Sequence, residues 1–216
     1  MIIRRYLLPF IMAFIWLGCN NRSTEQREDD GLLDAGTDPD AGLFHEQEQK
    51  DSVLLALTEE VLNTIKDRDY SKLAAYFHPK EGVRFSPYGY IDTLQHVHFS
   101  VAEFLEQAKK DQPIVWGSYD GTGKVIEMSL DAYFDKFVYE VDFLNAEQLG
   151  VNEVLGKGNS LINIQQVYPG SDFTESYFSG FEEKYGGMDW RSLRLIFKSE
   201  QGRPWLVGIV HDQWTV

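Results

Sequence analysis

The stretch MDWRSLRLIFKSEQGRPWLVGIVHDQWTV, which covers Met188–Val216, decides the fold of this protein. From Leu193 to Phe197, large apolar residues recur at every second position, as in a β-strand with one fully buried face. The sequence Gly-Arg-Pro at 202–204 interrupts the pattern before a second apolar run over 205–210. Two such runs on either side of a short turn predict a β-hairpin.

The second strand of this hairpin is apolar on both faces until it meets His211 and Asp212. A strand of this kind is typical of the centre of a sheet that is covered on both sides. The rest of the chain must therefore supply the cover. We expect the following hairpin side chains to be buried: Leu195, Phe197, Val207 and Ile209.

Length and composition limit the organisation of the chain. Its 216 residues are 43% hydrophobic and 14% aromatic, which is enough apolar material for one well-packed domain. The formal net charge of −14, without a cluster of lysine and arginine, excludes a nucleic-acid surface. Anionic lipid headgroups would also repel this protein, so attachment to a membrane requires hydrophobic insertion or a lipid chain.

The N-terminus predicts that attachment. Arg4 and Arg5 precede an uncharged run over 6–17, which is too short to span a bilayer and is typical of a cleaved signal peptide over 1–18. The residues before Cys19 resemble a bacterial lipobox, although Trp16 stands where leucine is usual. Cys19 is the only cysteine, which favours lipidation over disulfide bonding. The alternative is an ordinary secretory signal with an incidental cysteine. We expect a cell-envelope lipoprotein on the extracytoplasmic side of a membrane.

The segment after the signal differs from the rest of the chain. Residues 19–50 are acidic and poor in apolar side chains, so we expect the lipidated cysteine to be followed by a disordered tether. A single domain then covers 51–216. It begins with a helix from about Ser52 to Lys66, because apolar residues recur there at three- and four-residue spacing. Ser100 and Glu103 have the spacing of a capping box at the start of a later helix.

Apolar periodicity and turn residues predict the remaining elements. Further helices are expected over 69–77, 100–109 and 130–138, and further strands over 82–85, 114–119, 124–128, 161–168 and 173–181.

The run VLNTIKDRDYSKLAAYFHPKEGVRFSPYGYID, over 61–92, resembles the opening of the NTF2-like superfamily, also called SnoaL-like. The C-terminal block resembles the ending of uncharacterised exported bacterial domains with the same opening. The resemblance implies an α+β fold in which N-terminal helices pack in the concavity of a strongly curved, mostly antiparallel sheet, forming a cone with a pocket. It assigns no catalytic residues. The segment 131–160 is longer than a minimal cone needs.

Several side chains have chemistry that suits a pocket. His96 and His98 have the spacing of metal ligands on a strand, but no third ligand lies nearby in sequence, so we expect no metal and no cofactor. His211 and Asp212 interrupt an apolar strand but point to opposite faces, so they do not form a direct dyad. The candidates for lining a pocket are Tyr88, Tyr90, Glu175, Tyr177, His211, Asp212 and Trp214.

Two functions remain open from the sequence. One is a non-catalytic module that binds a small molecule or an envelope protein near His211, Asp212 and Trp214. The alternative is a pocket enzyme of the isomerase or dehydratase type found among NTF2-like proteins, with an Asp or His base. The purely structural interpretation of His211 and Asp212 is that they bond to backbone groups or to arginines such as Arg84, Arg191 or Arg194.

Overall fold

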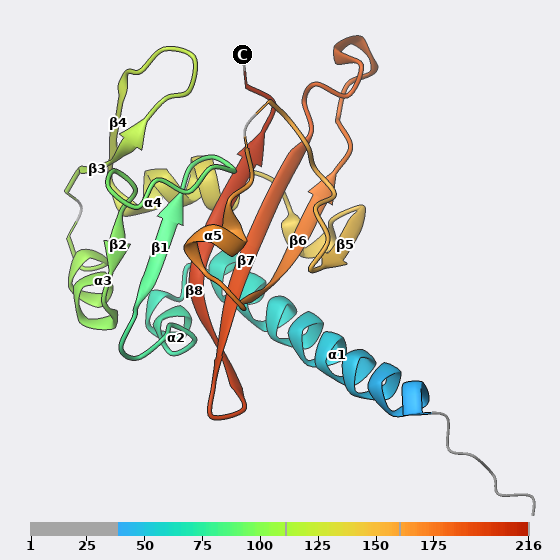
Figure 1. The fold of residues 1–216 in the computed structure, drawn as a ribbon. Coiled ribbons are helices and arrows are strands. Elements are labelled where there is room, and N and C mark those ends of the chain that lie inside the picture. Colours follow the sequence, from blue (N-terminus) through green and yellow to red (C-terminus); the bar gives the residue numbers. More distant parts are fainter. Residues whose placement is uncertain (1–38, 111, 160, 216) are drawn as a thin grey trace, which may run out of the picture. The chain divides into compact units, whose positions relative to one another are not determined.

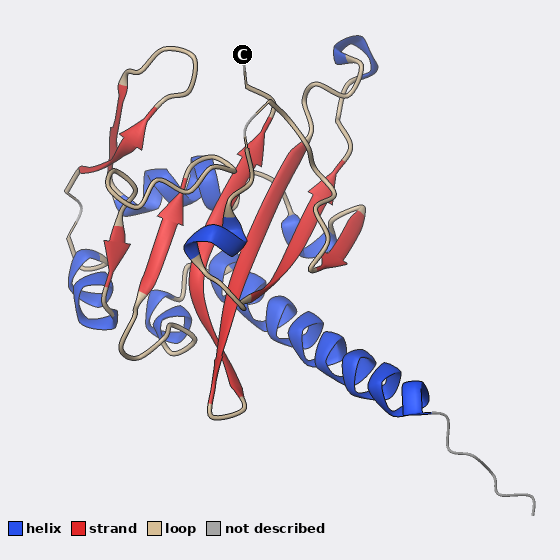
Figure 2. Ribbon diagram, viewed as in Figure 1, coloured by secondary structure: helices blue, strands red, loops and turns tan. Residues whose placement is uncertain are grey.

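The computed structural model of the protein describes residues 39–110, 112–159 and 161–215. These residues form an α+β fold around one mixed sheet of six strands (Figures 1 and 2). The strands follow the order β2 (His98–Phe99), β1 (Val83–Ser86), β8 (Arg203–Gln213), β7 (Arg191–Glu200), β6 (Asp172–Phe178) and β5 (Gln148–Val151). A separate antiparallel hairpin consists of β3 (Ile114–Ser118) and β4 (Val125–Met128).

The hairpin predicted at the C-terminus is confirmed as β7 and β8. These strands pair antiparallel from Arg191↔Gln213 to Glu200↔Arg203. On its other side β8 pairs with β1 in parallel, so β8 lies inside the sheet as its apolar composition predicts. The four hairpin residues expected to be buried are all at most 2% exposed: Leu195, Phe197, Val207 and Ile209.

Helices cover one face of this sheet. They are α1 (Pro39–Lys66), α2 (Tyr70–Ala74), α3 (Val101–Gln107) and α4 (Leu130–Tyr133), which continues as the π-helix η1 (Phe134–Val138). The capping box at the start of α3 is present: Ser100 N–H donates to Glu103 Oε2 over 2.8 Å, and Glu103 N–H donates to Ser100 Oγ over 3.3 Å. No helix in the described part of the chain is long and apolar enough to cross a membrane.

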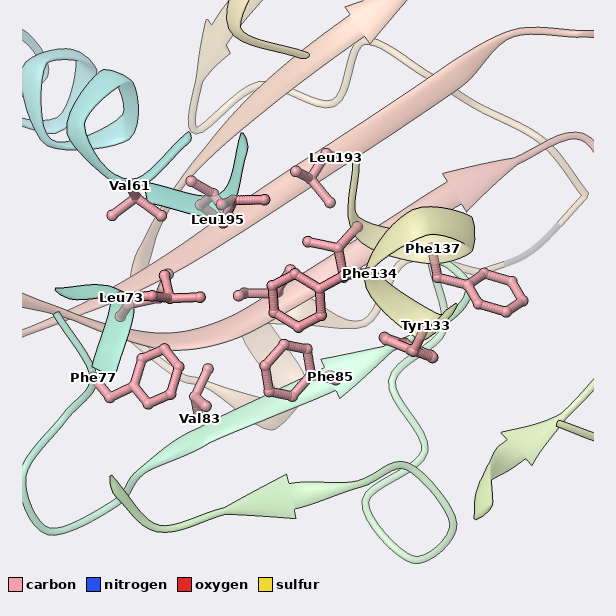
Figure 3. Packing of buried hydrophobic residues seen from close by; sticks show 14 of the residues in the cluster. Val61, Leu73, Phe77, Val83, Phe85, Tyr133, Phe134, Phe137, Leu193 and Leu195 are labelled. Carbon is pink, nitrogen blue, oxygen red and sulfur yellow. The ribbon is translucent and has the colours of Figure 1, made fainter. Parts of the chain in front are cut away.

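Aromatic side chains fill the space between these helices and the sheet (Figure 3). Phe85 on β1 stacks on Phe104 of α3 with ring centroids 5.9 Å apart. Trp116 on β3 stacks on Tyr133 of α4 with centroids 3.8 Å apart. Phe134 of η1 is fully buried in the same cluster. The interior that a cone would leave open for a ligand is therefore packed with rings.

The opposite face is covered by irregular chain and the short helix α5 (Ile164–Val167). Ile164 packs there with Ile196 of β7 and Val207 of β8. The strand predicted over 161–168 is wrong. The Asn163 side chain bonds to both backbone groups of Ile91, at 2.8 and 3.0 Å, which fastens this segment to another loop instead of to a sheet edge.

The first helix also differs from its prediction. It begins at Pro39 and not near Ser52, so residues 39–50, which were assigned to the tether, are helical. Lys50 of this part forms an ion pair with Asp172 at 2.7 Å. Proline suits the first turn of a helix because its missing N–H has no partner there in any case. The signal peptide, Cys19 and the tether up to residue 38 lie outside the described residues.

Candidate functional site

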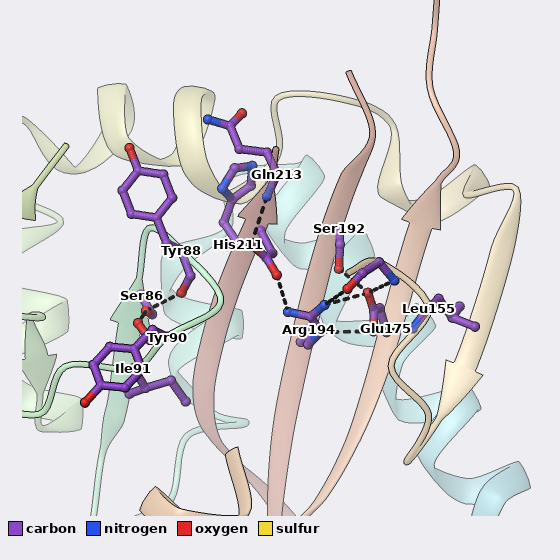
Figure 4. Close-up of polar contacts among 12 residues, drawn as sticks. Ser86, Tyr88, Tyr90, Ile91, Leu155, Glu175, Ser192, Arg194, His211 and Gln213 are labelled. Carbon is purple, nitrogen blue, oxygen red and sulfur yellow. Dashed lines mark hydrogen bonds and ion pairs between the residues drawn. The ribbon is translucent and has the colours of Figure 1, made fainter. Parts of the chain in front are cut away.

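A buried charged cluster crosses the three central strands of the sheet (Figure 4). Glu175 on β6 and Arg194 on β7 are direct cross-strand partners, and Arg194 also reaches Asp212 on β8. The guanidinium donates to both oxygens of Glu175, at 3.0 and 2.9 Å, and to Asp212 Oδ2 at 2.9 Å. All three residues are at most 1% exposed. Such fork-shaped pairing is the strong form of a charged hydrogen bond.

A loop closes over this cluster and completes its bonds. The N–H groups of Leu155 and Gly156 donate to Glu175 at 3.0 and 2.9 Å, and the Gly156 carbonyl accepts from Arg194 at 2.8 Å. Ser192 Oγ donates to Glu175 over 2.5 Å. A side chain at Gly156 would lie 2.7 Å from the ring of Trp190, so only glycine allows this close approach. Glu175 therefore has no lone pair left for a ligand.

Asp212 is sealed from its other side. A Cβ at Gly89 would lie 2.4 Å from Asp212 Oδ2, so the backbone of that loop packs directly on the carboxylate. Burial raises the pKa of Asp212, although Arg194 opposes the shift. Two carboxylates share a single guanidinium, so the buried cluster carries one excess negative charge if all three groups are ionised. Asp212 lines neither the hollow beside α1 nor the cavity beside Tyr88 and Tyr90, which are described below.

His211 faces the helices on the opposite side of β8, as the alternation along a strand predicts. Its Nδ1 lies 2.9 Å from the Pro87 carbonyl, and its Nε2 lies 2.6 Å from Glu140 Oε1. Arg191 Nε also bonds to Glu140, at 2.8 Å. Burial would raise the pKa of Glu140, but the bonds and charges of His211 and Arg191 outweigh it and lower the pKa. His211 is fully buried and has no side open to solvent. Its bond to Glu140 joins the segment after η1 to β8 of the sheet.

A ligand contact at His211 and Asp212 stays a prediction, and the structure shows how the two side chains are bonded without a ligand. His211 and Asp212 are each buried and bonded to a partner of their own, which agrees with the purely structural interpretation of bonds to backbone and to arginine. Trp214 is 38% exposed and lies just beyond the end of β8. Tyr177 packs near Trp190, with ring centroids 6.2 Å apart.

The other two candidates line a cavity of about 280 Å³ between the segment 88–96 and the β3–β4 hairpin. The rings of Tyr88 and Tyr90 both point away from β8 (Figure 4). Tyr90 is 49% exposed, whereas Tyr88 is nearly buried, and burial raises the pKa of Tyr88. The complete lining is Tyr88, Tyr90, Asp92, Gln95, His96, Ser118, Tyr119, Asp120, Gly121 and Gly123.

His96 fixes the shape of this cavity. Its Nδ1 accepts from Asp92 N–H at 3.1 Å and lies 2.8 Å from Ser86 Oγ, which ties the loop to β1. A backbone N–H can only donate, so Nδ1 is the acceptor and the proton of the neutral ring is on Nε2. Burial lowers the pKa of His96 to about 4. The ring packs on Gly117, where a Cβ would lie 3.1 Å from His96 Cδ2.

A second hollow of about 520 Å³ lies between α1, β6, β5 and the 3-10 helix η2 (Phe143–Asn145). Its lining is mostly apolar, with Leu55 and Leu62 from α1 and Leu149 from β5. Nothing among the described residues indicates what covers it.

The comparisons with family models, with curated proteins and with solved structures found no match to this chain. No three His, Cys, Asp or Glu side chains in the described part of the chain form a group that could hold a metal ion. The sequence did not single out Arg194 as the centre of the buried cluster, or Glu140 as the partner of His211. It identified His96 only as a possible metal ligand.

Proposed function

We propose that this protein is a lipid-anchored, extracytoplasmic binding module that holds a small molecule in the cavity beside Tyr88 and Tyr90 and catalyses no reaction. The observation that carries the proposal is the difference in bonding between this cavity and the buried charges. Glu175, Arg194 and Asp212 satisfy one another, whereas the cavity presents polar groups and tyrosine rings to open space. A few polar groups in a largely preformed hollow are typical of a ligand site.

At His211 and Asp212, the enzyme alternative lacks a place for a substrate. An isomerase or dehydratase needs its Asp or His base within hydrogen-bond reach of the atom that loses a proton. Asp212 is sealed by Gly89, and His211 is bonded at both ring nitrogens. A raised carboxyl pKa without an adjacent cavity is also what a structural cluster produces.

The fold assignment to the NTF2-like superfamily belongs to the same proposal. Two helices, a strand and a further helix precede the long strands, and helices pack on one face of a mostly antiparallel sheet. An experimental structure that measures the curvature of the sheet tests it. A flat sheet would contradict the cone.

The binding proposal is tested by a thermal-shift screen of the full chain in detergent against small polar metabolites. A ligand of the cavity raises the melting temperature of wild type and of the control Leu94→Ala, whose side chain is 95% exposed and outside the lining. Tyr90→Ala should abolish the shift. If a compound is instead turned over, and Asp212→Asn stops turnover without unfolding the protein, the enzyme alternative is correct.

The lipid anchor is tested separately. The full chain expressed in a bacterium and labelled with alkyne palmitate should incorporate the label at Cys19, because the thiol of that residue is the predicted acceptor. Cys19→Ser should remove the label and release the protein from the detergent phase. Equal labelling of both proteins would rule the anchor out.

A further inference from the structure

We propose that the ligand of the cavity beside Tyr88 and Tyr90 is a small organic cation with a compact ammonium group. This inference rests on the binding function proposed above and names its ligand class.

The charged groups of the lining are all acidic. Asp92 and Asp120 supply two carboxylates, and no lysine or arginine belongs to the lining. The hydrogen bond from Leu94 N–H and others lower the pKa of Asp92, which keeps it ionised. His96 stays neutral above about pH 4 and adds no compensating positive charge. An anion would be repelled here, whereas a cation is attracted both by the cavity and by the net charge of −14.

Three tyrosines surround the same space: Tyr88, Tyr90 and Tyr119. Cations are attracted to the faces of aromatic rings, and cages of such rings are a known means of binding quaternary ammonium groups. The ring of Tyr119 already holds the ammonium of Lys136, whose Nζ is 4.6 Å from the ring centroid and 2.9 Å from the hydroxyl, so Tyr88 and Tyr90 are the rings that remain for a ligand. The half-exposed ring of Tyr90 is the one that a ligand can reach from solvent.

The two carboxylates have different roles. Asp92 accepts from Leu94 N–H, Gln95 N–H and Gln95 Nε2, so both its oxygens hold the loop. Asp120 lies at the exposed hairpin tip and accepts from the adjacent Gly121 N–H at Oδ1. We therefore assign the direct ionic contact with the ligand to Asp120. Asp92 contributes electrostatic attraction at longer range. A cavity of about 280 Å³ is at the lower limit of ligand pockets, which suits a small head group.

The test uses choline as the probe and 3,3-dimethyl-1-butanol, its uncharged carbon isostere, as the matched control. Titration of the full chain in detergent should give saturable choline binding that weakens with added salt, and no binding of the isostere. Asp120→Asn and Tyr90→Leu should each weaken choline binding about ten-fold, and Leu94→Ala should leave it unchanged. Circular dichroism and the melting temperature show whether each variant is folded.

Glycerophosphocholine distinguishes two sources of the cation. Binding equal to that of choline indicates a lipid headgroup, and weaker binding, caused by repulsion of the phosphate, indicates a free ammonium compound. Equal binding of choline and its isostere would overturn the proposal. The proposal would also be overturned if choline did not bind and a neutral compound from the thermal-shift screen bound in a manner that depends on Tyr90. The binding function itself would then survive. If no compound binds in a manner that depends on Tyr90, the binding function itself fails.

Discussion

The buried cluster around Arg194 and the cavity around His96 are built from similar residues but behave differently. The cluster brings Glu175, Arg194 and Asp212 together, and a loop satisfies the remaining lone pairs of Glu175. The cavity also contains carboxylates: Asp92 is bonded to its own loop through both oxygens, whereas Asp120 accepts from Gly121 N–H through Oδ1 and lines the hollow. Charged residues in an apolar sequence therefore indicate a ligand site only where their bonds are left incomplete. Where the bonds are complete, they fasten strands to one another.

One loop separates the two regions. Gly89 presses its backbone onto Asp212 from one side, while its neighbours Tyr88 and Tyr90 line the cavity on the other. A change in the cluster should therefore alter the whole domain, whereas a change in the cavity should alter binding with a smaller effect on stability. The next three predictions test this contrast.

The largest effect is expected for Arg194→Met. This change leaves Glu175 and Asp212 as buried carboxylates without their shared cationic partner, which typically costs about 3–5 kcal/mol of unfolding free energy. Urea denaturation measures the loss. The control Arg203→Met removes an arginine that stacks on Trp205 at the surface and should cost less than about 1 kcal/mol.

The double variant Arg194→Met with Glu175→Gln sharpens this prediction. It removes one of the two stranded charges, so it should be more stable than Arg194→Met alone. If Arg194→Met costs no more than Arg203→Met, the cluster does not fasten the sheet and the contrast with the cavity is wrong.

An intermediate effect is expected for Gly117→Ala, at the position on β3 against which the His96 ring of the cavity packs. Gly117 has φ +130° at a bulge of β3, which a residue with a Cβ rarely adopts, and the added methyl would press on His96. The expected cost is about 1–3 kcal/mol, together with weaker ligand binding. Gly170→Ala is the control, because φ is +73° there, the added Cβ meets nothing within 4 Å and the residue lies outside the lining of the cavity. Equal loss of binding in both variants would show that His96 does not shape the site.

The smallest effect is a pH dependence at His96. The folded protein holds the pKa of His96 near 4, below the value of 6.5 for the unfolded chain. Between these values the unfolded chain binds more protons, so the stability contributed by neutral His96 is complete above about pH 6.5 and declines as the pH falls toward 4. His96→Asn keeps an acceptor for Asp92 N–H but does not titrate. The stability difference between wild type and His96→Asn should decrease over this range. A constant difference would mean that His96 is not held neutral.

Much of the fold could be predicted from local patterns. The hairpin of β7 and β8, the capping box at Ser100 and the turn between β3 and β4 each depend on residues close in sequence. Local patterns misled where tertiary contacts decide. The apolar residues of the segment 161–168 suggested a strand, but Asn163 bonds to Ile91 and the segment forms α5. Leu43 and Phe44 extend α1 without joining its buried stripe, so periodicity did not detect that part of the helix.

The candidate site was predicted less well, for a similar reason. Glu175 and Arg194 become partners only through the register of β6 and β7, which the sequence does not reveal. Tyr88 and Tyr90 were identified as pocket candidates because of the chemistry of their side chains. Their partners in the cavity, such as Asp120, come from a hairpin that is distant in sequence.

The parallel pairing of β1 with β8 also has a kinetic consequence. It joins Arg84 to Gly208, so the centre of the sheet requires two strands that are far apart in the chain. Contacts between such distant residues slow folding, because a long loop must close before they form. A nascent chain of this protein should therefore stay unfolded until β8 has been synthesised. That delay suits the proposed export, since a chain must be unfolded to be translocated, and it makes β8 the segment whose loss would prevent folding altogether.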